Sequence, residues 1–148
     1  MALKINKNIV SIASDHAGYL MKEYLINSLQ QEIIFCDLGT NNANDSVDYP
    51  YYAQLLAKDL YIQGNFGILI CNTGIGMSIA ANRHHHIRAA LCNDLDNTRL
   101  ARHHNDANVL VLSSKCIPII AVEIVRTFII TLFSNEDRHI RRINNLKC

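Results

Sequence analysis

Short runs of consecutive apolar residues alternate with longer stretches of helical spacing along this chain of 148 residues. The clearest run is residues 66–71, Phe-Gly-Ile-Leu-Ile-Cys, which has no polar side to present to water. Strands that are apolar on both faces are typical of a parallel sheet covered by helices on both sides. The sequence therefore predicts an α/β fold with a five-stranded parallel sheet. The strands are expected at residues 9–13, 33–36, 66–71, 87–92 and 108–112, and the main helices at 19–29, 52–62 and 117–133.

The length and composition fit one compact unit, and we predict a single domain over residues 1–148. Acidic and basic side chains nearly balance, with a formal net charge of +1, which argues against a general nucleic-acid binder. The most apolar stretch, residues 117–133, contains Pro118, Glu123 and Arg126 and is too short to cross a membrane. We therefore expect a core-packing helix there, and neither a nucleic-acid nor a membrane partner.

The cysteines are odd in number and none lies in a Cys-x-x-Cys pair, which does not fit a disulfide framework or a zinc site. The first eight residues lack the apolar run of a signal peptide. A reducing, cytoplasmic location is therefore expected. The cysteines are Cys36, Cys71, Cys92, Cys116 and Cys148.

Ligands of parallel α/β sheets bind beyond the carboxyl ends of the strands, so the residues after each predicted strand are candidates for a site. The strand at 66–71 ends in Cys71 and continues as Asn-Thr-Gly-Ile-Gly-Met-Ser at 72–78. A loop with two glycines before a helix can turn its N–H groups toward an anion, and the same field favours the thiolate form of Cys71. The loop thus offers a base beside an oxyanion cradle. The competing interpretation is a buried strand cysteine followed by glycines that only turn the chain.

Asp15 and His16 follow the first predicted strand, within Ser-Asp-His-Ala-Gly at 14–18. If the first and third strands are neighbours, both side chains lie at the same edge of the sheet as Cys71. A carboxylate there can orient or deprotonate a sugar hydroxyl, and an imidazole can bind a phosphate. The alternative is that Asp15 only caps the next helix.

Two further groups of polar residues stand before the fifth strand and near the C-terminus. His104 lies in Arg-His-His-Asn-Asp at 102–106 and could donate a proton to a sugar ring oxygen, or could serve only to complement a helix C-terminus. Arg138 and Arg142 share one helix face, where two guanidinium groups suit a phosphate. Exposed arginines on a terminal helix are the ordinary alternative. The run His84-His85-His86 is expected to be a solvated loop, since adjacent residues seldom converge on one metal ion.

Taken in order, these segments resemble the ribose-5-phosphate isomerase type B family, which also includes the galactose-6-phosphate isomerase subunits. The resemblance covers nearly the whole chain. Its most specific part is the Cys71 loop in combination with His-Asn-Asp-Ala-Asn at 104–108. The matching segments are residues 14–18, 48–50 (Asp-Tyr-Pro), 67–82, 87–90, 101–110 and 138–143.

The resemblance implies a Rossmann-like three-layer α/β/α sandwich that works as a homodimer or homotetramer, with each site built by two subunits. It implies interconversion of D-ribose 5-phosphate and D-ribulose 5-phosphate through an enediolate, in the non-oxidative pentose phosphate pathway, with no metal or cofactor. Cys71 matches the proton acceptor, His104 the residue that protonates the ring oxygen with help from Asp15, and Thr73 a hydroxyl near the first two sugar oxygens. Substrate contacts are implied for Asp15, His16, Asn72, Thr73, Gly74, Ile75, Gly76, Asn105, Lys115, Arg138 and Arg142.

The chain departs from the family pattern at four positions. Asn72 stands where the family usually has glycine, and it is the best-tolerated substitute if the position needs a positive φ. Lys115 replaces an arginine of the phosphate site, so weaker phosphate binding is expected because the forked guanidinium is lost. Arg83 and His86 replace a usual lysine and glycine and are expected to lie outside the chemistry.

Two other functions remain open on the sequence. One is the hexose reaction of galactose 6-phosphate, because pocket depth decides between the two sugars. The other is a phosphate- or nucleotide-binding module without catalysis, since a fold does not establish an activity. Against the latter, the Cys71 loop has neither the Gly-x-Gly-x-x-Gly order of a dinucleotide site nor the Gly-Lys-Ser/Thr of a P-loop.

Overall fold

The computed structural model describes residues 8–146. Its five strands are all parallel and follow the order β2-β1-β3-β5-β4, which confirms the predicted sheet. The strands are β1 (Asn8–Ser14), β2 (Ile33–Asp37), β3 (Phe66–Cys71), β4 (Ala89–Leu91) and β5 (Val109–Ser113). The helices are α1 (Tyr19–Leu29), α2 (Tyr49–Gln63), α3 (Ile75–Ala81), α4 (Leu95–Asn105), α5 (Pro118–Ile130) and α6 (Asp137–Asn144).

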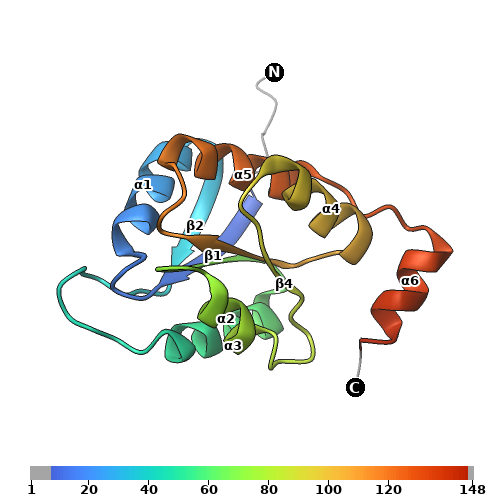
Figure 1. The fold of residues 1–148 in the computed structure, drawn as a ribbon, viewed down its shortest axis with the longest axis horizontal. Helices are drawn as coiled ribbons and strands as arrows, with labels where there is room; N and C mark the ends of the chain where they lie inside the picture. Colours follow the sequence, from blue (N-terminus) through green and yellow to red (C-terminus); the bar gives the residue numbers. More distant parts are fainter. Residues whose placement is uncertain (1–7, 147–148) are drawn as a thin grey trace.

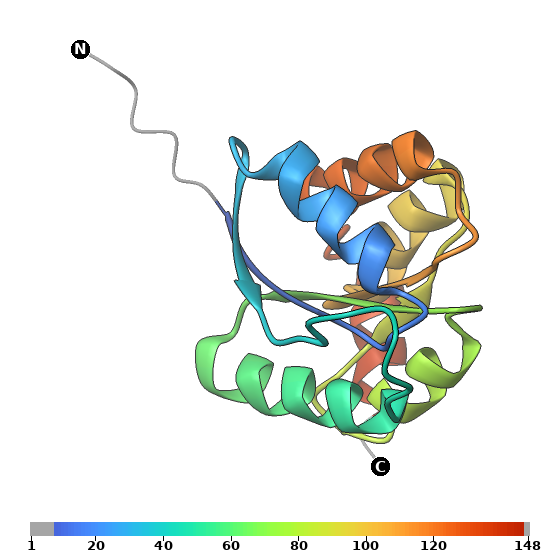
Figure 2. The same cartoon turned by 90° about the vertical axis from the view of Figure 1, so that its left-hand side faces the viewer.

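Helices cover both faces of the sheet, as the apolar strands predicted. α1, α4 and α5 lie on one face, and α2 and α3 lie on the other (Figure 1; Figure 2). Successive residues of a strand point to opposite faces, so each central strand supplies both cores. On β3, Ile68 and Ile70 belong to the core under α1 and α5, whereas Leu69 and Cys71 belong to the core under α2 and α3. α6 stands apart from the sheet, at the side of α4 (Figure 1).

Local signals explain where the helices begin and end. Pro50 lies in the first turn of α2, where a missing N–H removes no helical hydrogen bond. The same helix ends at Gly64, whose φ of 66° is the left-handed conformation that closes many helices. The Asp94 side chain caps α4 by accepting the N–H of Asn97 at 2.7 Å.

β4 is shorter than the strand predicted at residues 87–92. The N–H of Ile87 donates to the carbonyl of His84 at 2.9 Å, which closes a turn rather than extending the strand. The N–H of Arg88 donates to the Asn108 side chain at 2.7 Å. The prediction was wrong at this end because side-chain and turn bonds take the place of ladder bonds. α2 also begins three residues earlier, and α5 ends three residues earlier, than predicted.

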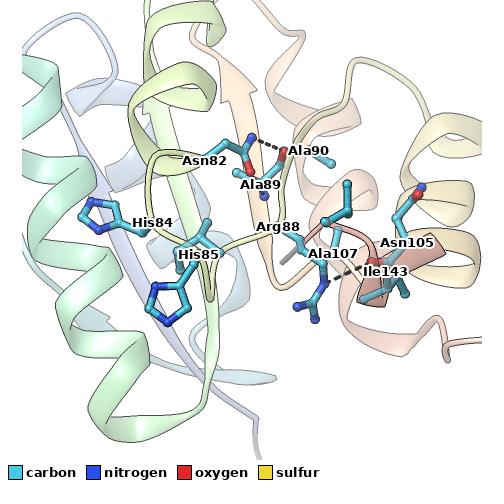
Figure 3. A pocket seen from close by; sticks show the side chains of 11 residues that line it. Asn82, His84, His85, Arg88, Ala89, Ala90, Asn105, Ala107 and Ile143 are labelled. Carbon is cyan, nitrogen blue, oxygen red and sulfur yellow. Dashed lines mark hydrogen bonds between the residues drawn. The ribbon is translucent and has the colours of Figure 1, made fainter. Parts of the chain in front are cut away.

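The outer side of β4 is closed by a side chain. Asn82 accepts the N–H of Ala89 through its amide oxygen and donates its amide nitrogen to the carbonyl of Ala89, both at 2.9 Å (Figure 3). The two groups of Ala89 would otherwise be open on the edge of the sheet. A side-chain amide therefore occupies the position that a sixth strand would use at this residue.

The apolar stretch near the C-terminus forms α5, whose buried face confirms the predicted core-packing helix. Five residues of this helix are buried: Ala121, Val122, Ile124, Val125 and Phe128. Across residues 8–146, no helix combines the length and the apolar character that crossing a membrane would require.

Candidate active site

The loops after β1 and β3 leave the sheet in opposite directions, because β1 leads into α1 on one face and β3 into α3 on the other (Figure 1). Such a topological switch point forms a crevice in which α/β proteins bind ligands. The N–H of Asp15 donates to the carbonyl of Ile70 at 3.2 Å and ties the two loops together. The loop after β5 joins them, since the N–H of Ser114 donates to the carbonyl of Cys71 at 2.9 Å. β1 and β3 are thus neighbours, as the placement of Asp15 beside Cys71 required.

Cys71 ends β3 with a sulfur that touches an amide donor. The residue is 4% exposed, and its Sγ accepts the N–H of Gly74 at 3.1 Å. Gly74 has a φ of 80°, which favours glycine and turns this N–H back toward the sulfur. The amides of Gly76 and Met77 lie in the first turn of α3 and have no acceptor inside the helix. The thiol and the amide donors meet in one loop as predicted, while apolar residues pack beneath the cysteine as the competing interpretation expected.

The residue after the thiol does not require glycine. Among residues 8–146, the non-glycine residues with a positive φ are Asp106 and Asn135, so Asn72 lies outside the left-handed region. Its carbonyl accepts the hydroxyl of Ser113 at 2.7 Å, and its side chain is exposed. Asparagine at this position therefore introduces no backbone strain.

Asp15 and His16 each use one side-chain atom to hold their loop. Asp15 is 6% exposed, and its Oδ1 accepts the N–H of Gly18 at 2.9 Å at the start of α1. This bond closes the turn before α1, whose N-cap residue is Gly18, while Oδ2 accepts no hydrogen bond from residues 8–146. His16 accepts the N–H of Val47 on Nδ1 at 3.1 Å. The ring therefore carries its proton on Nε2, which leaves a donor for a ligand.

Thr73 and Lys115 expose their side chains at this same edge. The hydroxyl of Thr73 accepts the N–H of Ile75 at 3.3 Å and keeps its own proton to donate. Lys115 is held through its backbone N–H, which donates to the Ser113 hydroxyl at 3.1 Å. Its ammonium group forms no ion pair within residues 8–146, so the cation is available to an anionic ligand.

Replacing Gly18 by alanine is expected to destabilise the protein and to displace this edge of the sheet. A Cβ at this position would lie 2.5 Å from the carbonyl oxygen of Ile70, and backbone cannot move away as a flexible side chain does. Overpacking of this kind costs about 1–3 kcal/mol or more in unfolding free energy. Gly64→Ala is the matched control, because its φ is 66° but nothing lies within 4 Å of the added carbon. We expect about 1 kcal/mol there, and equal losses by urea unfolding would contradict the steric explanation.

His104 and Asn105 lie at the opposite end of the sheet from Cys71, near the amino ends of the strands. They end α4, which runs from the carboxyl end of β4 back toward the start of β5. Asn108, just beyond the helix, accepts the N–H of Gly67 at the start of β3 at 2.9 Å. Gly67 and Cys71 are four residues apart in a strand, or about 13 Å at 3.3 Å per residue. One chain therefore does not place His104 beside its own Cys71.

The arginines of α6 join this second group. The ring of His104 packs against His139 of α6, with 4.5 Å between the ring centroids. Arg138 and Arg142 are exposed on the same helix. Arg138 donates from Nε to Glu136 at 2.7 Å, and this hydrogen bond lowers the pKa of the Glu136 carboxyl. The predicted acid thus packs against the helix that carries Arg138 and Arg142, two of the predicted phosphate ligands.

A groove of about 440 Å³ lies between α6, β4 and the end of α3 (Figure 3). Asn105 and Ile143 line one side, and Asn82 and His85 line the other. Arg88 lies between them and donates from Nε to the carbonyl of Asn105 at 3.1 Å. Asn105 therefore borders a groove at the edge away from Cys71.

The predicted site residues fall into two groups that one chain does not bring together. The carboxyl edge of the sheet holds Asp15, His16, Cys71, Asn72, Thr73, Gly74, Ile75, Gly76 and Lys115, and the other edge holds His104, Asn105, Arg138 and Arg142.

Two contacts near these groups had no role in the sequence prediction. The ring of Tyr49 lies so close to Gly76 that a Cβ there would be 2.6 Å from Cζ of the tyrosine. Asp-Tyr-Pro at 48–50 contributed to the resemblance, but only the placement of α2 beside α3 reveals this contact. The packing of His139 on His104 was also missed, because nothing in the spacing of the two residues connects α4 with α6.

The histidine run at 84–86 contacts α2. Nε2 of His86 lies 2.8 Å from the carbonyl oxygen of Ala57, and the ring of His86 packs against Tyr61 at 5.3 Å between centroids. No three His, Cys, Asp or Glu side chains within residues 8–146 are grouped closely enough to hold a metal ion.

The fold defines a doubly wound α/β protein with a thiol beside amide donors at the topological switch point. The family model for Ribose/Galactose Isomerase matches residues 10–146, and the chain belongs to that family. It is 38% identical over 112 residues to ribose-5-phosphate isomerase B of Escherichia coli, covering 73% of both chains. The structure of a ribose 5-phosphate isomerase from Thermotoga maritima matches with a TM-score of 0.90 and 47% identity, covering 95% of this chain and 97% of that one. The structure of ribose-5-phosphate isomerase B from Mycoplasma genitalium with bound ribulose 5-phosphate gives 0.87 and 37%, covering 93% of each.

Proposed function

We propose that this chain interconverts D-ribose 5-phosphate and D-ribulose 5-phosphate by proton transfer through an enediolate. The observation that carries the proposal is the contact between the Cys71 sulfur and the N–H of Gly74, in the loop that opens α3. A thiolate alone is too weak a base for a carbon acid beside a carbonyl. Amide donors aimed at the developing oxyanion supply the missing stabilisation, and removing one such donor costs about a hundredfold or more in other enzymes.

In the proposed reaction, His104 first protonates the ring oxygen of the aldose, and Asp15 assists ring opening by taking the proton from the O1 hydroxyl. Cys71 then removes the proton from C2, and the electron pair moves onto the carbonyl oxygen at C1 to give the enediolate. The sulfur then returns a proton to C1, and the proton of the O2 hydroxyl passes to O1, which leaves a hydroxyl at C1 and a ketone at C2. The amides of residues 72–76 and the Thr73 hydroxyl hold the two oxygens that carry the charge.

We further propose that two copies of the chain build each site, in a homodimer or homotetramer. The separation of His104 from Cys71 along β3 supports this, since both groups must contact one sugar. The phosphate would meet His16 and Lys115 of one copy, and Arg138 and Arg142 of the other. Fixing this remote group orients the reacting carbons. We place the reaction in the cytoplasm, because the cysteines described are all free thiols, which is typical of a reducing compartment.

A direct absorbance assay for the ketose formed from ribose 5-phosphate tests the proposal, with and without a chelator. We expect turnover that the chelator leaves unchanged, since the proposed chemistry uses only side chains and amides. Galactose 6-phosphate is the comparison substrate. Turnover of the hexose phosphate without turnover of the pentose phosphate would overturn the substrate assignment, and binding without turnover of either would overturn the enzymatic proposal.

A further inference from the structure

His139 is the buried side chain of α6, a helix otherwise exposed or half-exposed to solvent. The residue is 3% exposed, although it lies next to the exposed Arg138. Its ring packs on that of His104 with 4.5 Å between centroids and 38° between the ring planes. The proposed acid therefore has one face covered by an imidazole from another helix, which limits the orientations its own ring can adopt.

Ser134 holds the ring of His139 through a hydrogen bond. Its Oγ lies 2.6 Å from Nδ1 of His139 and also accepts the N–H of Glu136 at 3.2 Å. A neutral His139 with its proton on Nε2 accepts the Ser134 hydroxyl proton on Nδ1, whereas the other tautomer donates from Nδ1 to Oγ, and either arrangement holds the ring in place. The backbone N–H of Ser134 also donates to the carbonyl of His103 at 2.9 Å. The same residue is therefore hydrogen-bonded to α4 immediately before His104.

The charges around His139 agree with a neutral ring. Burial lowers the pKa of His139, and the nearby positive groups of His104, Arg138 and Arg142 lower it further. Glu136 is the charge that opposes them, and it is already bound to Arg138. His103 faces the same region from α4 and hydrogen-bonds through Nδ1 to the carbonyl of Leu132 at 3.3 Å. A neutral imidazole can pack on His104 without repelling the proton that the proposed acid must carry.

We infer that His139, held by Ser134, is a positioning residue that orients His104 for protonation of the sugar ring oxygen. The inference rests on the proposed function, in which His104 is the acid. It separates two steps of the reaction. Ring opening needs a well-oriented His104, whereas proton removal from the open-chain sugar needs Cys71 and its loop.

Ribulose 5-phosphate distinguishes these steps, because its O5 is phosphorylated and the sugar cannot close a five-membered ring. Exchange of a C1 hydrogen of this ketose with deuterated solvent requires enediolate formation but no ring chemistry. We therefore compare C1 exchange, followed by NMR, with net formation of ribose 5-phosphate. For His139→Asn, which can still accept the Ser134 hydroxyl but lacks the ring, we expect net isomerisation to fall about ten- to a hundredfold, the loss that misplacement of a catalytic group produces. Exchange should change by less than about threefold, since its groups lie at the other edge of the sheet.

Three further variants and one control variant make the test decisive. His104→Asn should show the same split between exchange and net reaction, and Ser134→Ala should show a weaker form of it. His139→Phe keeps a ring against His104 and should recover part of the loss caused by His139→Asn. Asn144→Ala, an exposed change on the same helix, is the control and should alter neither rate.

The outcomes separate the inference from the proposed function. Circular dichroism and thermal unfolding establish that each variant is folded. Equal losses of exchange and net isomerisation in folded His139→Asn would show that the residue only anchors α6, and unchanged rates would show that it is not needed; either result overturns the inference. A wild-type protein that catalyses neither exchange nor isomerisation would overturn the proposed function, and the inference with it.

Discussion

Replacing Cys71 by alanine is expected to lower kcat for ribose 5-phosphate by about 10²- to 10⁴-fold, the usual contribution of a positioned acid or base. The amide loop and the phosphate ligands remain, so binding of the sugar phosphate should persist. Exchange of the ketose C1 hydrogen should fall together with net isomerisation, because both pass through the enediolate. Steady-state kinetics and a direct binding titration measure the two effects separately.

Cys92→Ala is the matched control for this change. Cys92 is also a buried cysteine, 2% exposed, but it belongs to the core on the other face of the sheet. The same atoms are removed there without touching the proposed site, so kcat should stay near the wild-type value. Full turnover by Cys71→Ala would show that the sulfur is only a packing group at the end of β3.

Mixing two inactive variants is expected to restore activity. Cys71→Ala lacks the proposed base and His104→Asn lacks the proposed acid, and each should be nearly inactive alone. In a mixed dimer, the intact Cys71 of one chain meets the intact His104 of the other and forms one complete site. With free exchange of subunits, half of the dimers are mixed and one of their two sites works, so activity should recover to about a quarter of wild type.

A second pair of variants shows whether activity recovers when both substitutions lie at the same end of the sheet. Cys71→Ala mixed with Asp15→Asn should remain inactive, because both residues lie at one edge and reach every site from the same chain. The mixtures are assayed after brief mild denaturation, which allows subunits to exchange. Recovery in this second mixture, or none in the first, would contradict a site shared between two chains.

The sequence predicted the centre of the sheet well because β3 and β5 are buried on both faces. β3 and α1 have the predicted boundaries, since a continuous apolar run and a clear helical spacing leave few alternatives. β4 was the least accurately predicted strand. It is a short edge strand whose neighbouring residues bond to a turn and to the Asn108 side chain, and such tertiary bonds leave no periodic signal in the sequence.

Only the part of the candidate site at the carboxyl ends of the strands was predictable from the sequence. Asp15 and Cys71 end strands, and the rule that parallel strands point the same way places them together without further information. His104 ends a helix, and the direction of that helix assigns it to the opposite edge. The contact between His104 and His139 depends on how residues 131–136 turn α6 against α4, and this turn relies on Ser134 bonds that no sequence pattern encodes.

The amide of Asn82 has a consequence for the solubility of the folded chain. An exposed sheet edge invites strands from other molecules, and repeated addition of this kind builds fibres. On β4 an incoming strand would find the N–H and carbonyl of Ala89 already occupied and would have to displace a side chain held by two hydrogen bonds. A single side chain thus occupies the outward backbone groups of Ala89, and a strand added on this side would form no ladder hydrogen bonds at that residue.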